Sequence, residues 1–172
     1  MAVNEYNPLV FVDGSAPALS AENLNHGEQG IKRSSFRPGG TFTGSVTTDA
    51  SFTKKSPVFT GWTYFGGASD TGDYDIRDGT KGFIIPDGFA VAWVKLFVEF
   101  STYSADQSKI ELIHYRGSTE TILDSDGADS AIVNPHLHCS AFVPVQAGDK
   151  IYPYVYGKEA QSNAVVMQIV LL

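Results

Sequence analysis

The sequence predicts an all-β chain: an antiparallel β-sandwich or jelly-roll head, preceded by a short N-terminal helix and an extended, intertwined shaft. Gly, Ser and Thr are abundant, aromatic residues make up 12% of the chain and charged residues only 18%, which is typical of short strands and tight turns. About eight apolar runs follow one another in the second half, separated by Asp, Gly, Ser and Pro turns. No helical period lies between these runs, so the strands are expected to pair with one another.

Residues 1–33 contain the one segment with helical signals, "ALSAENLNHGEQGI". A serine stands at the N-cap position, two leucines take the positions of a hydrophobic staple, and Gly30 followed by an isoleucine marks the C-terminal end. These residues are Leu19, Ser20, Leu24 and Ile31. The helix is about nine residues long, which is too short to be stable alone in water. We therefore expect this segment to be ordered only against a partner surface.

Residues 34–82 are rich in Gly, Thr and Ser, and we predict a shaft or collar there. The stretch "GGTFTGSVTT" alternates with a period of two. The composition also suits a flexible linker. Bulky apolar residues nevertheless recur along the tract, and one sparse chain cannot bury them. They are Phe42, Val46, Phe52, Val58, Phe59, Trp62 and Phe65. Several chains wound round a common axis could bury them, so the tract indicates oligomerisation.

Residues 83–172 are predicted to form the globular head. The expected strands cover 83–86, 89–101, 108–116, 119–123, 131–133, 137–145, 150–156 and 163–171. In the strand 89–101 the even positions from Ala90 are all apolar and form one core face, while the odd positions include Trp93 and Phe97. A sandwich buries only one side of each sheet, so the second apolar side needs a cover. We favour a subunit interface over a folded-back loop, because the loops in this half are short.

A second candidate surface is the stretch "KIYPYVYG", which places Tyr152, Tyr154 and Tyr156 on one side of a strand. Tyrosine offers both apolar area and a hydroxyl, so a row of tyrosines can fill a subunit interface or stack on a sugar. We predict that these residues belong to the trimer interface, together with Trp93 and Phe97. Binding of a receptor glycan is the alternative.

The pentapeptide "PHLHC" has the His-x-His spacing of some metal sites. The alternation predicts instead that His136 and His138 face solvent while Leu137 and Cys139 point inward. We therefore expect neither a metal site nor a bound cofactor. The acidic stretch "DSDGADS" lacks the glutamate that closes an EF-hand loop, and we expect a polar hairpin turn there.

Several functions are disfavoured by composition. The net charge of −7, without a cluster of Lys and Arg, argues against a nucleic-acid partner. No apolar run reaches the roughly 20 residues that span a bilayer, so we expect no membrane insertion. No Gly-x-Ser-x-Gly motif is present, and the acidic residues lie in turn-like segments without the apolar surroundings that raise a carboxyl pKa. We predict that the chain is not an enzyme.

Three stretches resemble known families. "SAENLNHGEQGI" is similar to the N-terminal segment of phage and prophage tail or appendage proteins, and "GGTFTGSVT" resembles the glycine–threonine collar repeats of phage fibre shafts. "FIIPDGFAVAWVKLFVEF", taken with "FVPVQAGDKIYPYVYG", resembles the trimeric jelly-roll heads of the tumour-necrosis-factor and complement type.

The resemblance implies a homotrimeric tail fibre, head fibre or spike, made in the host cytoplasm and displayed on the outside of the virion. Residues 1–33 would attach the chain to another virion protein. The head would bind a host cell-surface glycan or protein, or decorate the capsid. Two other hypotheses stay open: a monomeric carbohydrate-binding module of a bacterial surface or secreted protein, and a small hydrolase.

Overall fold

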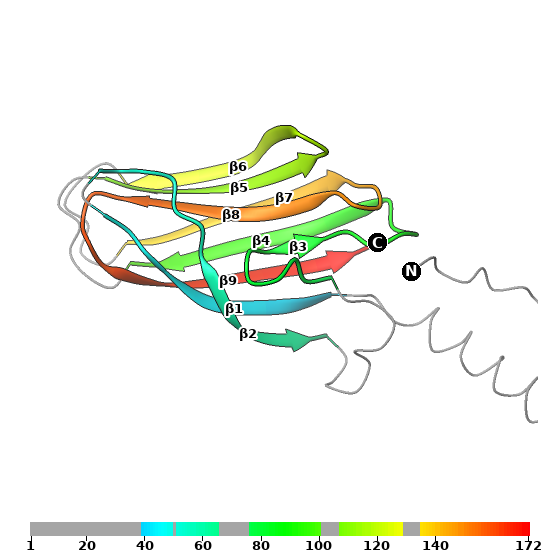
Figure 1. Cartoon of the computed structure of the whole chain (residues 1–172), viewed down its shortest axis with the longest axis horizontal. Helices are drawn as coiled ribbons and strands as arrows, with labels where there is room; N and C mark the ends of the chain where they lie inside the picture. The colour runs from blue at the N-terminus through cyan, green and yellow to red at the C-terminus, as the bar shows by residue number, and fades with distance from the viewer. Residues whose placement is uncertain (1–38, 50, 66–75, 101–106, 129–134) are drawn as a thin grey trace, which may run out of the picture.

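The fold consists of two antiparallel β-sheets packed face to face (Figure 1). The computed structural model describes residues 39–49, 51–65, 76–100, 107–128 and 135–172. Its strands are β1 (Gly39–Thr47), β2 (Val58–Tyr64), β3 (Phe83–Ile84), β4 (Val91–Glu99), β5 (Ser108–Arg116), β6 (Thr119–Ala128), β7 (His136–Pro144), β8 (Lys150–Gly157) and β9 (Ser162–Leu171). The first sheet has the order β2-β1-β9-β4-β7 and the second β3-β8-β5-β6. The predicted class, an all-β antiparallel jelly roll, is confirmed.

The core lies between the two sheets, and the period-two pattern of the strands builds it. In β4 the side chains of Val94, Leu96 and Val98 are buried while their neighbours in sequence face outward. Strand β9 contributes its alternate residues from the same sheet, and β5 and β8 contribute theirs from the opposite sheet. Each fully buried aliphatic side chain stabilises the fold by roughly 1.5–3 kcal/mol.

The structure corrects the predicted shaft over residues 34–82. Strand β1 pairs with β9 from Gly39 opposite Val170 to Thr47 opposite Ser162, and β2 pairs with β1 at the edge of the same sheet. Phe42 is 2% exposed, and its ring centroid lies 4.6 Å from that of Phe83. The described part of this tract therefore belongs to the head, which includes residues from Gly39 onward. The tract needs no second chain to bury Phe42, because β9 and β3 lie beside and beneath it.

Two strand boundaries also differ from the prediction. Strand β4 begins at Val91, and Ala90, expected on the core face, is exposed. Strand β6 continues to Ala128, so the described part of the acidic stretch, residues 124–128, lies in a strand and not in a hairpin turn. The polar residues are compatible with a strand because β6 is an edge strand and its carboxylates accept hydrogen bonds from backbone N–H groups of β7. The expected strand 131–133 lies outside the described residues.

The described chain enters the sandwich at one of its two ends. Gly39, where the described chain begins, lies opposite Val170, so the chain enters the sandwich beside the C-terminal end of β9 (Figure 1). The far end holds the paired residues Thr47 and Ser162. The predicted helix with Leu19, Ser20, Leu24 and Ile31 lies outside the described residues. In the part of the chain that the structure describes, no helix has the length and apolarity needed to cross a membrane.

Candidate functional site

The first candidate surface is the outward side of β4, β9 and β7, here called the apolar face. Its large side chains are Trp93, Phe97, Phe142, Val166 and Val170. Phe142 is 71% exposed and Phe97 41%, and the rings of Trp93 and Phe142 stack with centroids 5.9 Å apart. Large contiguous apolar patches of this kind on a folded domain mark interaction sites.

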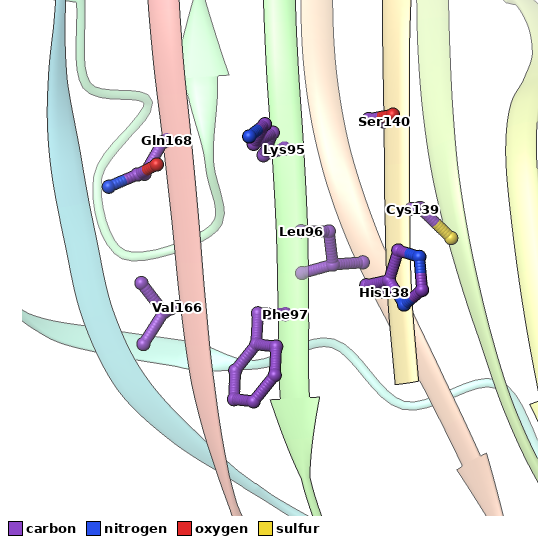
Figure 2. Close-up of a pocket in the computed structure, with 8 residues that line it drawn as sticks. All are labelled: Lys95, Leu96, Phe97, His138, Cys139, Ser140, Val166 and Gln168. Atoms are coloured by element: carbon purple, nitrogen blue, oxygen red, sulfur yellow. The ribbon is translucent and has the colours of Figure 1, made fainter. Parts of the chain in front are cut away.

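A polar row crosses the apolar face at its middle. Lys95 of β4 lies opposite Ser140 of β7 on one side and Gln168 of β9 on the other. Together with Phe97 and His138 these side chains line a shallow depression, while Leu96 and Cys139 form its floor from the buried side of the sheet (Figure 2). The Lys95 ammonium lies 4.7 Å from the Trp93 ring centroid. All the polar groups at this depression can donate hydrogen bonds, and Lys95 is the one lysine or arginine among its lining residues.

The two histidines of β7 lie where the alternation predicts. His136 and His138 are exposed on the outward side, and Leu137 and Cys139 are buried. Among the described residues, no group of three or more His, Cys, Asp and Glu side chains lies close enough together to hold a metal ion. The His136 ring packs against Phe97 with centroids 5.7 Å apart, so this histidine extends the apolar face.

The second candidate surface is the outward side of β8 and β5, here called the tyrosine face. Tyr152, Tyr154 and Tyr156 alternate with buried residues of β8 and are half-buried. The strand β5 adds Tyr115, whose hydroxyl lies 2.9 Å from the Tyr154 hydroxyl. The tyrosines therefore share one side of the strand, as predicted, and form a connected row with a neighbour on the next strand.

Every tyrosine of this row has a polar partner within the chain. Tyr156 donates to Glu111 at 2.7 Å, Tyr115 donates to Glu120 at 2.8 Å, and Tyr152 donates to Asp78. Burial and these carboxylates raise the pKa of all three phenols above the usual value. Lysines lie over the rings: the Lys54 ammonium is 4.1 Å from the Tyr154 ring centroid.

The charges on the tyrosine face cancel in pairs. Lys54 pairs with Glu120, Lys109 with Glu111, and Lys150 with Asp78. Because the hydroxyls, the ring faces and the charges all have partners inside the chain, this face is internally satisfied. It offers few free groups to a ligand.

The two sets of predicted interface residues lie on opposite sides of the sandwich. Trp93 and Phe97 belong to the outward side of the first sheet, and Tyr152, Tyr154 and Tyr156 to the outward side of the second. A single sheet face therefore presents only one of the two sets. The sequence pattern gave the side of each strand but not the sheet to which it belongs.

A buried polar cluster at the end of the sandwich was not foreseen. Asp149 is 2% exposed and accepts hydrogen bonds from His114 Nε2 at 2.8 Å, from the Arg116 guanidinium at 2.8 Å and from the Gln146 backbone N–H at 3.0 Å. Burial raises the pKa of this carboxyl, but the Arg116 and His114 hydrogen bonds outweigh burial, and the pKa lies below its usual value. Gly148 reaches a φ of 84° in the turn that places Asp149, a conformation that favours glycine. The cluster holds this turn against β5.

Two described side chains of kinds that catalysis often uses, Cys139 and His114, are buried. Cys139 is 1% exposed, and burial raises the pKa of its thiol to about 12, so the thiolate is scarce near neutral pH. His114 is buried against Asp149 and Arg116.

The predicted anchor residues Leu19, Ser20, Leu24 and Ile31 lie outside the described residues.

Solved structures of other proteins share this fold. The globular domain of zebrafish complement 1qA matches with a TM-score of 0.55 at 14% identity, over 78% of this chain and 97% of that domain. Murine APRIL at pH 8.5 matches with a TM-score of 0.60 at 8% identity, over 80% of this chain and 100% of that chain. Eiger TNF from S. frugiperda matches with a TM-score of 0.53 at 13% identity, over 79% and 92% of the two chains. The chain has the jelly-roll fold of the tumour-necrosis-factor and complement heads.

By sequence, no protein-family model and no curated protein matches the chain. At the identities of the structural matches, the likeness establishes the fold alone. The matched share of the chain, about four fifths, exceeds the predicted head of residues 83–172. This agrees with a head that includes β1 and β2.

Proposed function

We propose that the chain is a structural protein of a phage virion, a homotrimeric fibre or spike held on the particle by its N-terminal segment. Its head recognises the host surface or decorates the capsid. The observation that carries the proposal is the apolar face of β4, β9 and β7, where Trp93, Phe97 and Phe142 stand on the outside of an already complete sandwich.

Self-association is the simplest cover for this face. Among the described residues the core between the sheets is closed without these side chains, so their apolar surface lies outside it. The fold is that of the tumour-necrosis-factor and complement heads, which the sequence also resembles, and those heads are trimeric. A cyclic trimer buries one such face per copy and closes without leaving a copy of the face exposed.

The resemblance of residues 1–33 to phage appendage N-termini supports attachment to the particle. The described chain enters the head at Gly39, beside the C-terminal end of β9, so an anchor before Gly39 holds the head by one end. The opposite end then points away from the particle. With the correction above, the head follows the attachment segment closely, and we propose a short appendage.

A structural role also agrees with the chemistry of the described residues. The thiol of Cys139 is buried with a raised pKa, and the carboxylates of the tyrosine face are paired with lysines. Groups held in this way are poor nucleophiles and poor general acids. We propose no enzymatic activity.

The alternative function is a monomeric carbohydrate-binding module that uses the tyrosine face. Sugar-binding aromatic platforms need free ring faces and free hydrogen-bonding groups. Here the ammonium groups of Lys54, Lys109 and Lys150 lie over tyrosine rings, 4.1–5.9 Å from the ring centroids. Carboxylates accept the hydrogen bonds that the tyrosine hydroxyls donate. These contacts favour the fibre proposal over this alternative.

The proposal is tested by the mass of the full chain in solution and by its location on particles. We expect a trimer at micromolar concentration in sedimentation velocity and in native mass spectrometry. We also expect electron microscopy of antibody-labelled particles to show label on the virion exterior. A monomer that binds polysaccharide would support the alternative, and particles without label would contradict the virion role.

A further inference from the structure

We propose that Lys95 of each copy forms an ion pair with Asp124 of the neighbouring copy, across an interface that joins the apolar face of one chain to the β6–β7 edge of the next. This inference rests on the proposed trimer and names its contact surfaces. It follows from the charges that lack a partner among the described residues and from the positions of these charges along the strands.

Lys95 is a cation in an apolar setting without a counter-ion. It stands in the middle of the apolar face, between Trp93 and Phe97 on the same side of β4. It makes no ion pair with any described residue, and its ammonium lies over the Trp93 ring. If another copy covers this face, the Lys95 ammonium loses water, and a buried charge without a partner is strongly destabilising. The covering surface must therefore bring a carboxylate.

Within the described part of the chain, four carboxylates are candidates for this partner. Asp87, Glu99, Asp124 and Asp126 make no ion pair with a lysine or arginine of the described chain. Asp124 accepts hydrogen bonds only from backbone N–H groups, those of Ser125 at 2.9 Å and Ser140 at 2.8 Å. Asp126 does the same and lies 3.8 Å from His138 Nδ1. Both aspartates are half-buried at the β6–β7 edge of the sandwich, and neither pairs with a described lysine or arginine.

A closed ring with three copies needs a heterologous interface, which joins two different surfaces of the chain. The stripe of Trp93, Phe97 and their neighbours on β9 runs along the strands, so an axis parallel to the strands buries the whole stripe. Copies related by such an axis have equal height. Groups that meet across the interface therefore lie at the same level, meaning the same position along the strand direction.

Lys95 and Asp124 lie at the same level. Lys95 is the register partner of Ser140 on β7, and the Ser140 backbone N–H donates to Asp124 on β6. Within one chain Lys95 projects from the face while Asp124 lies beyond the edge of the sheet. Glu99 is on the face itself, four residues or about 13 Å further along β4, and so lies at another level.

The neighbouring level is apolar. Phe142 is the register partner of Trp93, which pairs in turn with Val170. Phe142 is 71% exposed on β7, the edge strand of its sheet. An edge that presents Phe142 at one level and Asp124 at the next therefore meets Trp93 at the first level and Lys95 at the second.

A charge swap tests this pairing in the full-length chain. Lys95→Glu places two carboxylates together, and Asp124→Lys places two ammonium groups together. We expect each change to raise the concentration at which the trimer dissociates by about tenfold or more, and the double variant Lys95→Glu/Asp124→Lys to return to within about threefold of the native value. Native mass spectrometry and sedimentation over a dilution series measure these midpoints.

Two further variants keep the test decisive. Lys81→Glu makes the same charge change in an exposed turn and should leave the midpoint unchanged. If Asp124→Lys prevents folding, as judged by circular dichroism, Asp124→Asn replaces it, because an amide oxygen can still accept from Ser140. Asp124→Asn must then relieve the effect of Lys95→Glu. The pairing is overturned if Lys95→Glu leaves the dissociation midpoint of the trimer unchanged. It is also overturned if neither Asp124→Lys nor Asp124→Asn lowers the midpoint of the Lys95→Glu variant. A native chain that is monomeric overturns the trimer itself.

Discussion

His114 Nε2 lies 2.8 Å from Asp149 Oδ2, and both side chains are buried at the end of the sandwich where β5 meets the turn before β8. Arg116, two residues further along β5, binds the same carboxylate from the solvent side. One aspartate thus joins a strand of the second sheet to the connection that leaves the first sheet. The stability of the head should depend strongly on it.

Asp149→Asn should lower the free energy of unfolding by about 2–3 kcal/mol, because the Arg116 and His114 donors lose a charged acceptor in a buried site. Urea denaturation at one fixed protein concentration measures this change. Asp87→Asn, in an exposed turn, is the matched control and should cost less than about 0.5 kcal/mol. Equal effects of the two substitutions would contradict a structural role for the cluster.

The same carboxyl makes stability depend on pH. The pKa of Asp149 is lower in the folded chain than its usual value, so its contribution is present above the unfolded-state pKa and is lost as the pH falls through the folded-state pKa. We therefore expect the stability difference between the native chain and Asp149→Asn to shrink below about pH 4. Urea titrations at a series of pH values give this difference directly. A difference that stays constant down to acid pH would show that Asp149 is not stabilised as an anion.

The membership of residues 39–65 in the head is tested at Phe42. This ring packs between Phe59 and Phe83 at centroid distances of 4.9 and 4.6 Å. Phe42→Ala should destabilise the head by about 3–5 kcal/mol, whereas Thr43→Ala, on the exposed side of the same strand, should have little effect. Calorimetry of the full chain measures the unfolding temperature of the head. If Phe42→Ala leaves this temperature unchanged, residue 42 is not part of the head and the predicted shaft is supported instead.

The two outward faces are distinguished by removing one aromatic ring from each. Phe97→Ser takes an exposed ring from the apolar face and should weaken the trimer by about tenfold or more in its dissociation midpoint. Tyr154→Ser takes a ring from the tyrosine face and should leave the trimer intact, although the hydrogen bond to Tyr115 is lost. Light scattering after size-exclusion chromatography gives the masses. The opposite pattern would place the interface on the tyrosine face.

Deletion of residues 1–33 should separate assembly of the head from attachment to particles. We expect the shortened chain to fold and to form a trimer, because the described strands and the apolar face are retained. We also expect it to be missing from purified particles assembled in its presence, when the full chain is incorporated. Incorporation of the shortened chain would show that the anchor lies elsewhere.

Local pattern sufficed to predict most of the described strands of the second half, apart from the extension of β6 to Ala128, because a period of two shows in neighbouring residues. It also revealed that β4 is apolar on both sides, and therefore that Trp93 and Phe97 point away from the core. Local pattern does not show which strands pair with one another. The partner of β1 is β9, more than a hundred residues away, and nothing within the stretch around Phe42 distinguishes a strand of the head from a strand of a shaft.

The same limit applies to the polar sites. Asp149 and Asp124 both stand in stretches of turn-forming residues, and the sequence gives no sign that one is buried against an arginine and the other caps a strand edge. The tyrosines of β8 were placed on the correct side of their strand. Their partners come from β5, from the segment before β2 and from Asp78 before β3, so only the folded chain shows that the row is already satisfied.

The position of Gly39 beside the end of β9 gives the head a direction. In the proposed appendage, a protein fused after Leu172 would sit near the particle wall, crowded by its neighbours. A peptide inserted between Lys158 and Ala160, at the opposite tip, would stand furthest into the medium. The turn between β8 and β9 is thus the natural site for displaying a foreign epitope or a new binding loop. Each chain would carry one insert, so each trimer would present three.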